Sequence, residues 1–226
     1  MSGCVAIIAA LPREIAGLVR GTKPDVGLLH RGIHLHRLPH AIVVAAGMGS
    51  QRVTLAFAEA VAAASISTVI STGLAGSCTS GLAAGNVGEA SAVIEARTGE
   101  RFVTVSPPSA YVLATTETIA SVREKARLAE TYAAAMVDME AATVARLAAA
   151  HELPFRAIKA ISDAHDFELA SLARFAGKNG YFRTGAFAIH TALRPHHWSK
   201  AMQLGRVSTL ALASLHAALR EVVAAV

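Results

Sequence analysis

Two carboxylates stand at chain positions where acids rarely serve stability alone. Glu140 lies between the apolar segment 133–137 and an alanine-rich stretch with helical spacing, and Asp163 follows the apolar segment 155–161. Carboxylates at the C-terminal ends of neighbouring strands converge on the crevice where α/β sheets bind ligands. Each acid could instead cap a helix N-terminus, as nearby Asp138 could also do. As a pair, Glu140 and Asp163 favour a binding or catalytic site.

A third acid, Glu14, follows the apolar segment 5–10 within Leu-Pro-Arg-Glu. Pro12 suits the first position of a helix, and an acid in the first helical turn is favoured by the helix dipole. A structural role therefore explains Glu14 when it is considered alone. As a third acid at a third strand end, Glu14 becomes a candidate general base.

Two glycine-containing turns follow strand-like segments. Residues 47–49 (Gly-Met-Gly) lie between the strand-like segment 42–46 and the helix-like segment 53–64, and residues 73–76 (Gly-Leu-Ala-Gly) close another strand. Glycines at such turns let a ligand approach the backbone. The dinucleotide fingerprint is incomplete, because Arg52 occupies its third glycine position. We therefore expect a ligand-binding turn and no nucleotide cofactor.

Other catalytic classes find little support in the sequence. Ten histidines are present, but none has the i, i+4 spacing with a nearby carboxylate that zinc hydrolases use. The histidines between positions 30 and 40 are more typical of a solvated edge strand. No Gly-x-Ser-x-Gly motif indicates a serine hydrolase. Two cysteines, Cys4 and Cys78, make neither a disulfide framework nor a metal site, so no metal is expected.

The elements that must position these acids alternate along the chain. Strand-like segments are expected at 5–10, 42–46, 68–72, 87–94, 102–105, 111–114, 133–137 and 155–161, and helices at 53–64, 120–130 and from about Ser199 to the end. Strands spread so evenly predict an α/β protein with one mixed central sheet flanked by helices. Nothing resembles a linker, so residues 1–226 are expected to form a single three-layer domain.

The net charge of +5 is distributed unevenly, because residues 169–220 contain no acid. This stretch could meet phosphate, nucleic acid or an anionic lipid surface, although a solvated helical surface is the simpler interpretation. No basic ribbon interleaved with aromatic residues is present, so a nucleic-acid partner is not expected. No uninterrupted apolar run approaches the roughly 18 residues of a spanning helix, and no signal peptide is recognisable. We expect a soluble, cytoplasmic protein.

Four segments together resemble the nucleoside phosphorylase superfamily, especially its methylthioadenosine/S-adenosylhomocysteine nucleosidase branch. They lie at 7–14, 46–49, 71–76 and 137–166, in the order in which the family has them. Met-Glu-Ala and Ala-Ile-Ser-Asp in the last segment are the specific part. The resemblance implies a phosphorylase-like fold, a small-molecule nucleoside as the partner, and assembly as at least a homodimer.

The resemblance also implies cleavage of the N-glycosidic bond between a purine and a ribose. Asp163 would protonate N7 of the leaving base as a general acid, with a water-poor strand end keeping its proton in place. Glu140 would bind the ribose hydroxyls, Met139 would pack on the sugar, and Glu14 would activate the attacking water. The remaining residues expected to bind substrate are Gly47, Gly49, Gly73, Leu74, Ala75, Ile119 and Ser162.

The resemblance favours water over phosphate as the attacking group. Ser71 stands where related phosphorylases carry a phosphate-binding arginine, and Leu-Pro-Arg-Glu replaces their phosphate loop. Phosphate needs charge-assisted donors, for which Arg13, Arg52 or an arginine of another subunit are the candidates. A glutamate at position 14 would also repel a phosphate dianion. A phosphate-dependent phosphorylase and a non-catalytic nucleoside binder are the alternatives.

The sequence leaves the nucleoside itself open. The aromatic residue that stacks on adenine in the family has no counterpart in residues 115–119, and Leu74 replaces a serine of the family motif. Lys159 stands at a position that is often arginine. The substrate could be similar to methylthioadenosine or S-adenosylhomocysteine. It could also be a lipid-linked adenosine as in hopanoid biosynthesis, which would suit the apolar and basic C-terminal third and could bring the protein to a membrane surface.

Overall fold

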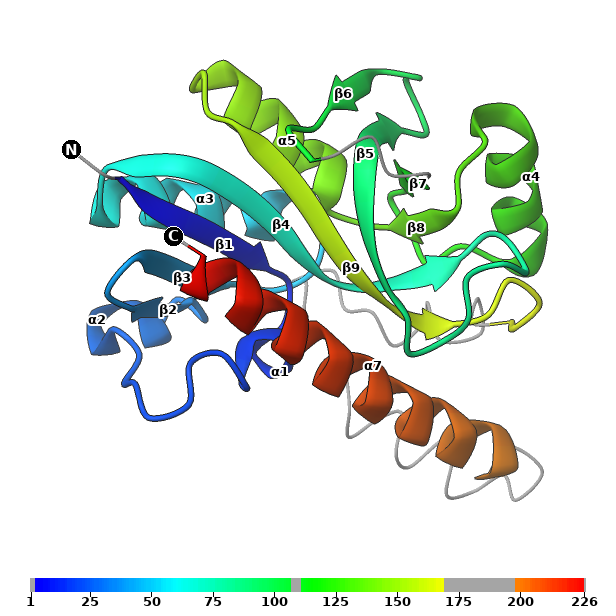
Figure 1. The fold of residues 1–226 in the computed structure, drawn as a ribbon, viewed down its shortest axis with the longest axis horizontal. Helices are drawn as coiled ribbons and strands as arrows, with labels where there is room; N and C mark the ends of the chain where they lie inside the picture. Colours follow the sequence, from blue (N-terminus) through cyan, green and yellow to red (C-terminus); the bar gives the residue numbers. More distant parts are fainter. Residues whose placement is uncertain (1–2, 107–110, 169–197, 226) are drawn as a thin grey trace.

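The computed structural model describes residues 3–106, 111–168 and 198–225, which form a mixed β-sheet between two layers of helices (Figure 1). The elements are β1 (Cys4–Ala9), α1 (Pro12–Ile15), α2 (Val26–Leu29), β2 (His34–Arg37), β3 (Ala41–Ala45), α3 (Ser50–Ala63), β4 (Ile66–Ser77), β5 (Val87–Glu95), β6 (Arg101–Val103), β7 (Tyr111–Thr115), α4 (Val122–Tyr132), β8 (Met136–Asp138), α5 (Ala141–Ala150), β9 (Phe155–Asp163) and α7 (Trp198–Ala224). The expected α/β class with a mixed sheet flanked by helices is confirmed.

The strands follow the order β2-β3-β1-β4-β8-β7-β5-β6, and β9 pairs with both β4 and β5. The pairings among β4, β9, β5, β7 and β8 therefore close into a ring. Strands β3, β1, β4 and β9 run parallel, so their carboxyl ends meet at one edge. In Figure 1 the arrowheads of β4 and β9 lie together, between α4 and α7. This edge collects the residues that follow each strand.

Helices cover both faces of the sheet, and β1 shows how the sequence specifies this. Its residues alternate between two cores: Ala6 and Ile8 pack on the side of α3 and α5, while Val5, Ile7 and Ala9 pack on the side of α1 and α7. Successive side chains of a strand point to opposite faces, so a strand covered on both faces is apolar throughout. A continuous apolar run is therefore the sequence pattern of these central strands.

Most expected elements are confirmed within a few residues, but two expectations were wrong. The strand expected at 133–137 begins only at Met136, because α4 extends to Tyr132 and ends on Ala133 in the left-handed conformation (φ 52°). Residues 73–76 are not a turn after a strand. They lie inside β4, and the irregularity that their glycines permit is a register shift between Ala75 and Gly76 opposite β9.

The long C-terminal helix α7 crosses one face of the sheet (Figure 1). Its residues Ala211, Leu215 and Leu219 are buried there, one turn apart along a single helix face. The span Gly205–Ala224 is long and apolar enough to cross a membrane by length and composition, although 17% of its most apolar window is buried in the structure. Ala211, Leu215 and Leu219 dock on the sheet, but most of this window is not buried, so α7 is not a core helix.

Candidate active site

A cavity of about 560 Å³ lies at the carboxyl edge of β1, β4, β8 and β9, with α7 forming one wall. Its lining combines the three predicted acids, and Asp138 as a fourth, with apolar side chains and a few hydroxyl groups. The lining residues are Ala10, Leu11, Arg13, Glu14, Met48, Leu74, Ala75, Gly76, Thr116, Thr118, Ile119, Ala120, Lys125, Val137, Asp138, Met139, Glu140, Ser162, Asp163, Gly205, Ser208, Thr209 and Leu212. A mostly apolar hollow with a few converging polar groups is the usual form of a small-molecule site.

Glu14 is buried just past β1, and backbone donors hold its carboxylate in place. Oε2 accepts hydrogen bonds from the backbone N–H of Ala10 at 3.1 Å and of Leu11 at 2.9 Å, and Oε1 accepts from that of Leu74 at 3.4 Å. Gly73 (φ 130°) makes room for this group, because a Cβ atom there would lie 2.9 Å from Oε2. Burial raises the pKa of Glu14, against the backbone donors and the charges of Lys159 and Arg13. A raised pKa brings a carboxylate closer to what a general base requires.

At the start of α5, one acid caps the helix and another turns its side chain elsewhere. Glu140 occupies the N-cap position, yet its side chain makes no capping hydrogen bond. Its Oε1 instead accepts from the backbone N–H of Gly49, at 2.8 Å. Asp138 performs the capping, because its Oδ2 accepts from the backbone N–H of Ala141 at 3.0 Å. Glu140 therefore does not cap α5 with its side chain, and capping does not explain why this side chain is buried.

Burial and a neighbouring acid act together on Glu140. Burial first, and then the charge of Asp138, raise the pKa of Glu140 to about 7, while Lys159 and the N–H of Gly49 act in the opposite direction. Lys159 lies 2.8 Å from Oδ2 of Asp138 and is itself buried. Its ammonium also donates to Ser71 Oγ and to the backbone carbonyl of Thr72, both at 3.1 Å. Lys159 thus offsets part of the negative charge gathered at this edge.

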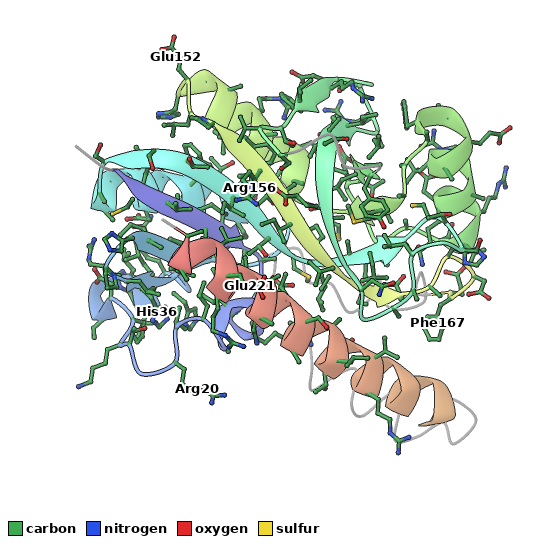
Figure 2. The ribbon with its side chains drawn as sticks, viewed as in Figure 1. Arg20, His36, Glu152, Arg156, Phe167 and Glu221 are labelled. Atoms are coloured by element: carbon green, nitrogen blue, oxygen red, sulfur yellow. The ribbon has the colours of Figure 1, made fainter. Side chains whose placement is uncertain are left out.

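Asp163, at the end of β9, is held by two side chains. Ser162 Oγ donates to its Oδ1 at 2.6 Å, and the ammonium of Lys125 on α4 forms a buried ion pair with its Oδ2. Lys125 also donates to the carbonyl oxygens of Ala164 at 2.8 Å and of Phe167 at 3.2 Å. Figure 2 labels Phe167 in the loop beyond β9. Asp163 is therefore buried at the end of β9 with a hydroxyl group on one carboxylate oxygen and an ammonium on the other.

The structure brings most of the predicted site residues together around the cavity. Those among its lining are Glu14, Leu74, Ala75, Ile119, Met139, Glu140, Ser162 and Asp163. The three predicted glycines are not among the lining residues of this cavity, although Gly49 lines a second hollow next to it. Gly49 donates to Glu140, Gly73 gives space to Glu14, and the N–H of Gly47 donates to the carbonyl of Ala10 at 2.8 Å. Gly49 and Gly73 thus bear on the positions of two carboxylates, and Gly47 on the loop after β1.

Sequence reasoning missed Lys125 and the wall formed by α7. Lys125 belongs to a helix with several charged residues, where a lysine normally faces solvent. The sequence did contain one indication. Lys125 lies three residues before Leu128, the other buried residue of α4, so the two side chains share one face of the helix. On α7 the signal was helical spacing, since Gly205, Ser208, Thr209 and Leu212 share one face.

A second, polar hollow of about 1000 Å³ adjoins the first and shares Met48, Thr116 and Met139 with it. Arg52 lines this second hollow and uses its guanidinium on backbone carbonyls: it donates to Ala46 O, and also to Arg31 O at 2.9 Å and Gly32 O at 3.1 Å. Arg52 therefore has a structural task that competes with holding phosphate. Among the described residues, no cluster of three or more His, Cys, Asp or Glu side chains could hold a metal ion.

Comparison with known proteins supports the same fold. A family model described as the phosphorylase superfamily matches residues 108–180. An apo structure of Arabidopsis thaliana 5'-methylthioadenosine nucleosidase has a TM-score of 0.72 at 18% identity, covering 97% of this chain and 94% of its own. Streptococcus pneumoniae MTA/SAH nucleosidase in complex with 8-aminoadenine has a TM-score of 0.59 at 21% identity, covering 82% and 96%.

A futalosine hydrolase mutant of Helicobacter pylori has a TM-score of 0.61 at 19% identity, covering 80% of this chain and 96% of its own. No curated relative matches the chain at the level of sequence. At these identities the structural likeness establishes the fold, and the family model adds a sequence match over part of the chain. The fold and the match over residues 108–180 together confirm the resemblance to the phosphorylase superfamily.

Proposed function

We propose that this protein is a purine nucleosidase that hydrolyses the N-glycosidic bond of an adenosine-type nucleoside. The observation that carries the proposal is the convergence of Glu14, Glu140 and Asp163 on one cavity from three separate strand ends. Three buried acids in one place destabilise a fold through desolvation and repulsion, so their presence is better explained by chemistry than by packing. The nucleosidases named above share the fold and support the same assignment.

In the proposed reaction the three acids divide the work. As the C1'–N9 bond breaks, its electron pair moves to the purine, and Asp163 delivers a proton to N7 so that the base leaves neutral. Glu140 holds the ribose hydroxyls and offsets the positive charge that develops on the sugar, with Met139 packed against it. Glu14 takes a proton from the water that attacks C1'. The products are a free purine and ribose or its 5'-substituted form.

Water rather than phosphate is the proposed nucleophile. Among the described residues that line the cavity, the cationic side chains are those of Arg13 and Lys125. Lys125 is committed to Asp163 and two carbonyl groups, and Arg13 lies next to the acid that would repel a phosphate dianion. A phosphate-dependent phosphorylase would need several charge-assisted donors, and among the described lining residues Arg13 alone remains to supply them.

The 5' substituent is the finer part of the proposal. A 5'-thio-substituted adenosine is the first candidate, because the structurally similar Arabidopsis nucleosidase is named for 5'-methylthioadenosine. A lipid-linked adenosine is the second candidate. It is favoured by the wall that α7 contributes, since in the described part of the chain α7 is the helix that is long and apolar enough by composition to cross a membrane.

We further propose that residues 1–226 act as one domain, in a cytoplasmic homodimer. The domain proposal is supported by the Arabidopsis nucleosidase, which matches 97% of the chain along nearly its own full length. The dimer is supported by the family resemblance, and sedimentation equilibrium of the purified chain would measure it. A monomer at all protein concentrations tested would contradict the dimer.

Release of free base tests the proposed function. Adenosine, inosine, methylthioadenosine, S-adenosylhomocysteine and a lipid-linked adenosine are each incubated with the protein, with and without phosphate, and free purine is quantified. We expect an adenosine-type substrate to release adenine equally in both buffers. Asp163→Asn should lower turnover by about 10²–10⁴-fold if Asp163 is the general acid. Strict dependence on phosphate would identify a phosphorylase, and saturable binding without turnover would identify a non-catalytic binder.

A further inference from the structure

The ion pair between Lys125 and Asp163 is the feature of the site that the proposed reaction leaves unexplained. Both side chains are buried, at 1% and 5% exposure. The ammonium reaches the carboxylate from α4, 38 positions earlier in the chain. Removing two charges from water is costly, and a buried pair is weak evidence of a stabilising role. A role in the chemistry is the more economical explanation.

The surroundings are built so that this contact can form. A Cβ atom on Gly76 would lie 2.9 Å from Asp163 Oδ2 and 3.1 Å from Lys125 Cε, so a glycine here lets both side chains approach β4. The three hydrogens of the ammonium have three acceptors: Oδ2 of Asp163 and the carbonyl oxygens of Ala164 and Phe167. The pair is therefore fixed in position and direction.

The pair changes how a proton can reach the leaving base. The ammonium of Lys125 donates directly to the carboxylate, so a proton on Lys125 lies one hydrogen bond away from Asp163. Two other groups near Asp163 carry a proton. Ser162 donates a hydroxyl that is a far weaker acid than an ammonium, and burial raises the pKa of the Cys78 thiol to about 12. Of these groups, Lys125 is the cation, and it is in direct contact with Oδ2 of the carboxylate.

We infer that Lys125 supplies the proton that Asp163 passes to N7 of the leaving purine, an inference that rests on the proposed nucleosidase activity. An N–H bond of Lys125 breaks as an O–H bond forms on Asp163. The carboxyl group then gives a proton to N7 while the C1'–N9 electron pair moves to the base. Lys125 ends as a neutral amine, Asp163 as a carboxylate and the base as a neutral purine. Lys125 regains its proton from solvent water before the next turnover.

Two substrates with different leaving groups can distinguish a role of Lys125 in proton supply from a purely structural role. A purine nucleoside needs a proton at N7, whereas 4-nitrophenyl β-D-riboside releases a stable phenolate without one. Lys125→Met should slow the purine nucleoside by about 10²–10⁴-fold and the nitrophenyl riboside by less than about tenfold. Arg127→Met is the matched control, because it removes a cation from the exposed face of the same helix. It should leave both rates unchanged.

A second comparison, between a double variant and Asp163→Asn alone, keeps the inference testable even if Lys125→Met fails to fold. Lys125→Met leaves Asp163 buried without its partner, which can unfold the protein, whereas Lys125→Met combined with Asp163→Asn leaves neither charge unpaired. Because the two residues act in series, the double variant should cleave the purine nucleoside no more slowly than Asp163→Asn alone. A further loss in the double variant would overturn the inference.

The remaining outcomes show whether the role of Lys125 or the proposed nucleosidase function has failed. Equal loss on both leaving groups in Lys125→Met, or no loss on either, would overturn the role of Lys125 while leaving the nucleosidase intact. Absence of turnover by the unmodified protein on every nucleoside would instead overturn the proposed function, and the inference with it.

Discussion

At the scale of single residues, the start of α5 shows how two neighbouring acids came to have different tasks. Asp138 caps the helix and pairs with Lys159, and Glu140, two residues later, turns towards Gly49 and the cavity. The sequence favoured a site role for Glu140 and left helix capping open as the alternative, with Asp138 as a possible cap. It could not assign Lys159 to Asp138, since that contact depends on how β9 packs beside the loop.

Substitution of Asp138 should therefore mainly lower the stability of the protein, whereas substitution of Glu140 should mainly lower its turnover. Asp138→Asn leaves the buried ammonium of Lys159 without its partner and should cost about 3–5 kcal/mol in the free energy of unfolding. Glu140→Gln keeps an acceptor for the N–H of Gly49 and should retain the fold while abolishing most turnover. Urea denaturation and base-release assays on both variants measure this split. If Glu140→Gln unfolded the protein as readily as Asp138→Asn, Glu140 would have a structural role.

At the scale of elements, α7 links the far end of the chain to the site. Its buried residues dock on the sheet, and Nε2 of His216 lies 3.1 Å from the carbonyl oxygen of Glu14 and 3.2 Å from that of Arg13. The helix thus supports α1, which carries Glu14, and also forms one wall of the cavity. Its existence was predictable from length and periodicity, but its place over the site was not, because residues 169–197 separate it from β9.

Docking of α7 can be tested by a pair of leucine substitutions. Leu215 is fully buried against the sheet, so Leu215→Ala should cost about 2–5 kcal/mol in the free energy of unfolding and lower turnover. Leu210 is 58% exposed on the same helix, and Leu210→Ala should cost less than about 1 kcal/mol. Denaturation curves of both variants measure the difference. Equal effects would mean that α7 does not depend on its buried face.

At the scale of the whole molecule, the strands were predictable and the site was only partly so. Central strands covered on both faces are apolar throughout, which made β1, β3 and β9 recognisable. The continuation of β4 through residues 73–76 was missed, because glycines that follow an apolar segment usually indicate a turn. The Lys125–Asp163 pair was also missed. It depends on α4 and β9 meeting at one edge of the sheet, which no local pattern in either segment indicates.

The buried acids should make stability depend on pH. The folded-state pKa values of Glu14 and Glu140 are raised above the ordinary value of 4.5, to about 7 for Glu140. Folding therefore favours their neutral forms, and the free energy of unfolding should fall as the pH rises from about 4.5 through about 7.

Replacing both acids, as Glu14→Gln with Glu140→Gln, should remove this part of the pH dependence and make the protein more stable than the unmodified chain at pH 8. Urea denaturation between pH 5 and pH 8 measures the difference between the two proteins. A constant difference across that range would contradict the raised pKa values.

The central claim is that water attacks C1' of a purine nucleoside in the cavity between β1, β4, β8 and β9. The most direct measurement is turnover in H₂¹⁸O buffer containing phosphate, with the sugar product examined by mass spectrometry. We predict one ¹⁸O atom in the sugar, next to unlabelled free purine, and loss of this product in Glu14→Gln. An unlabelled ribose 1-phosphate product would show that phosphate is the nucleophile and would contradict the proposed hydrolysis.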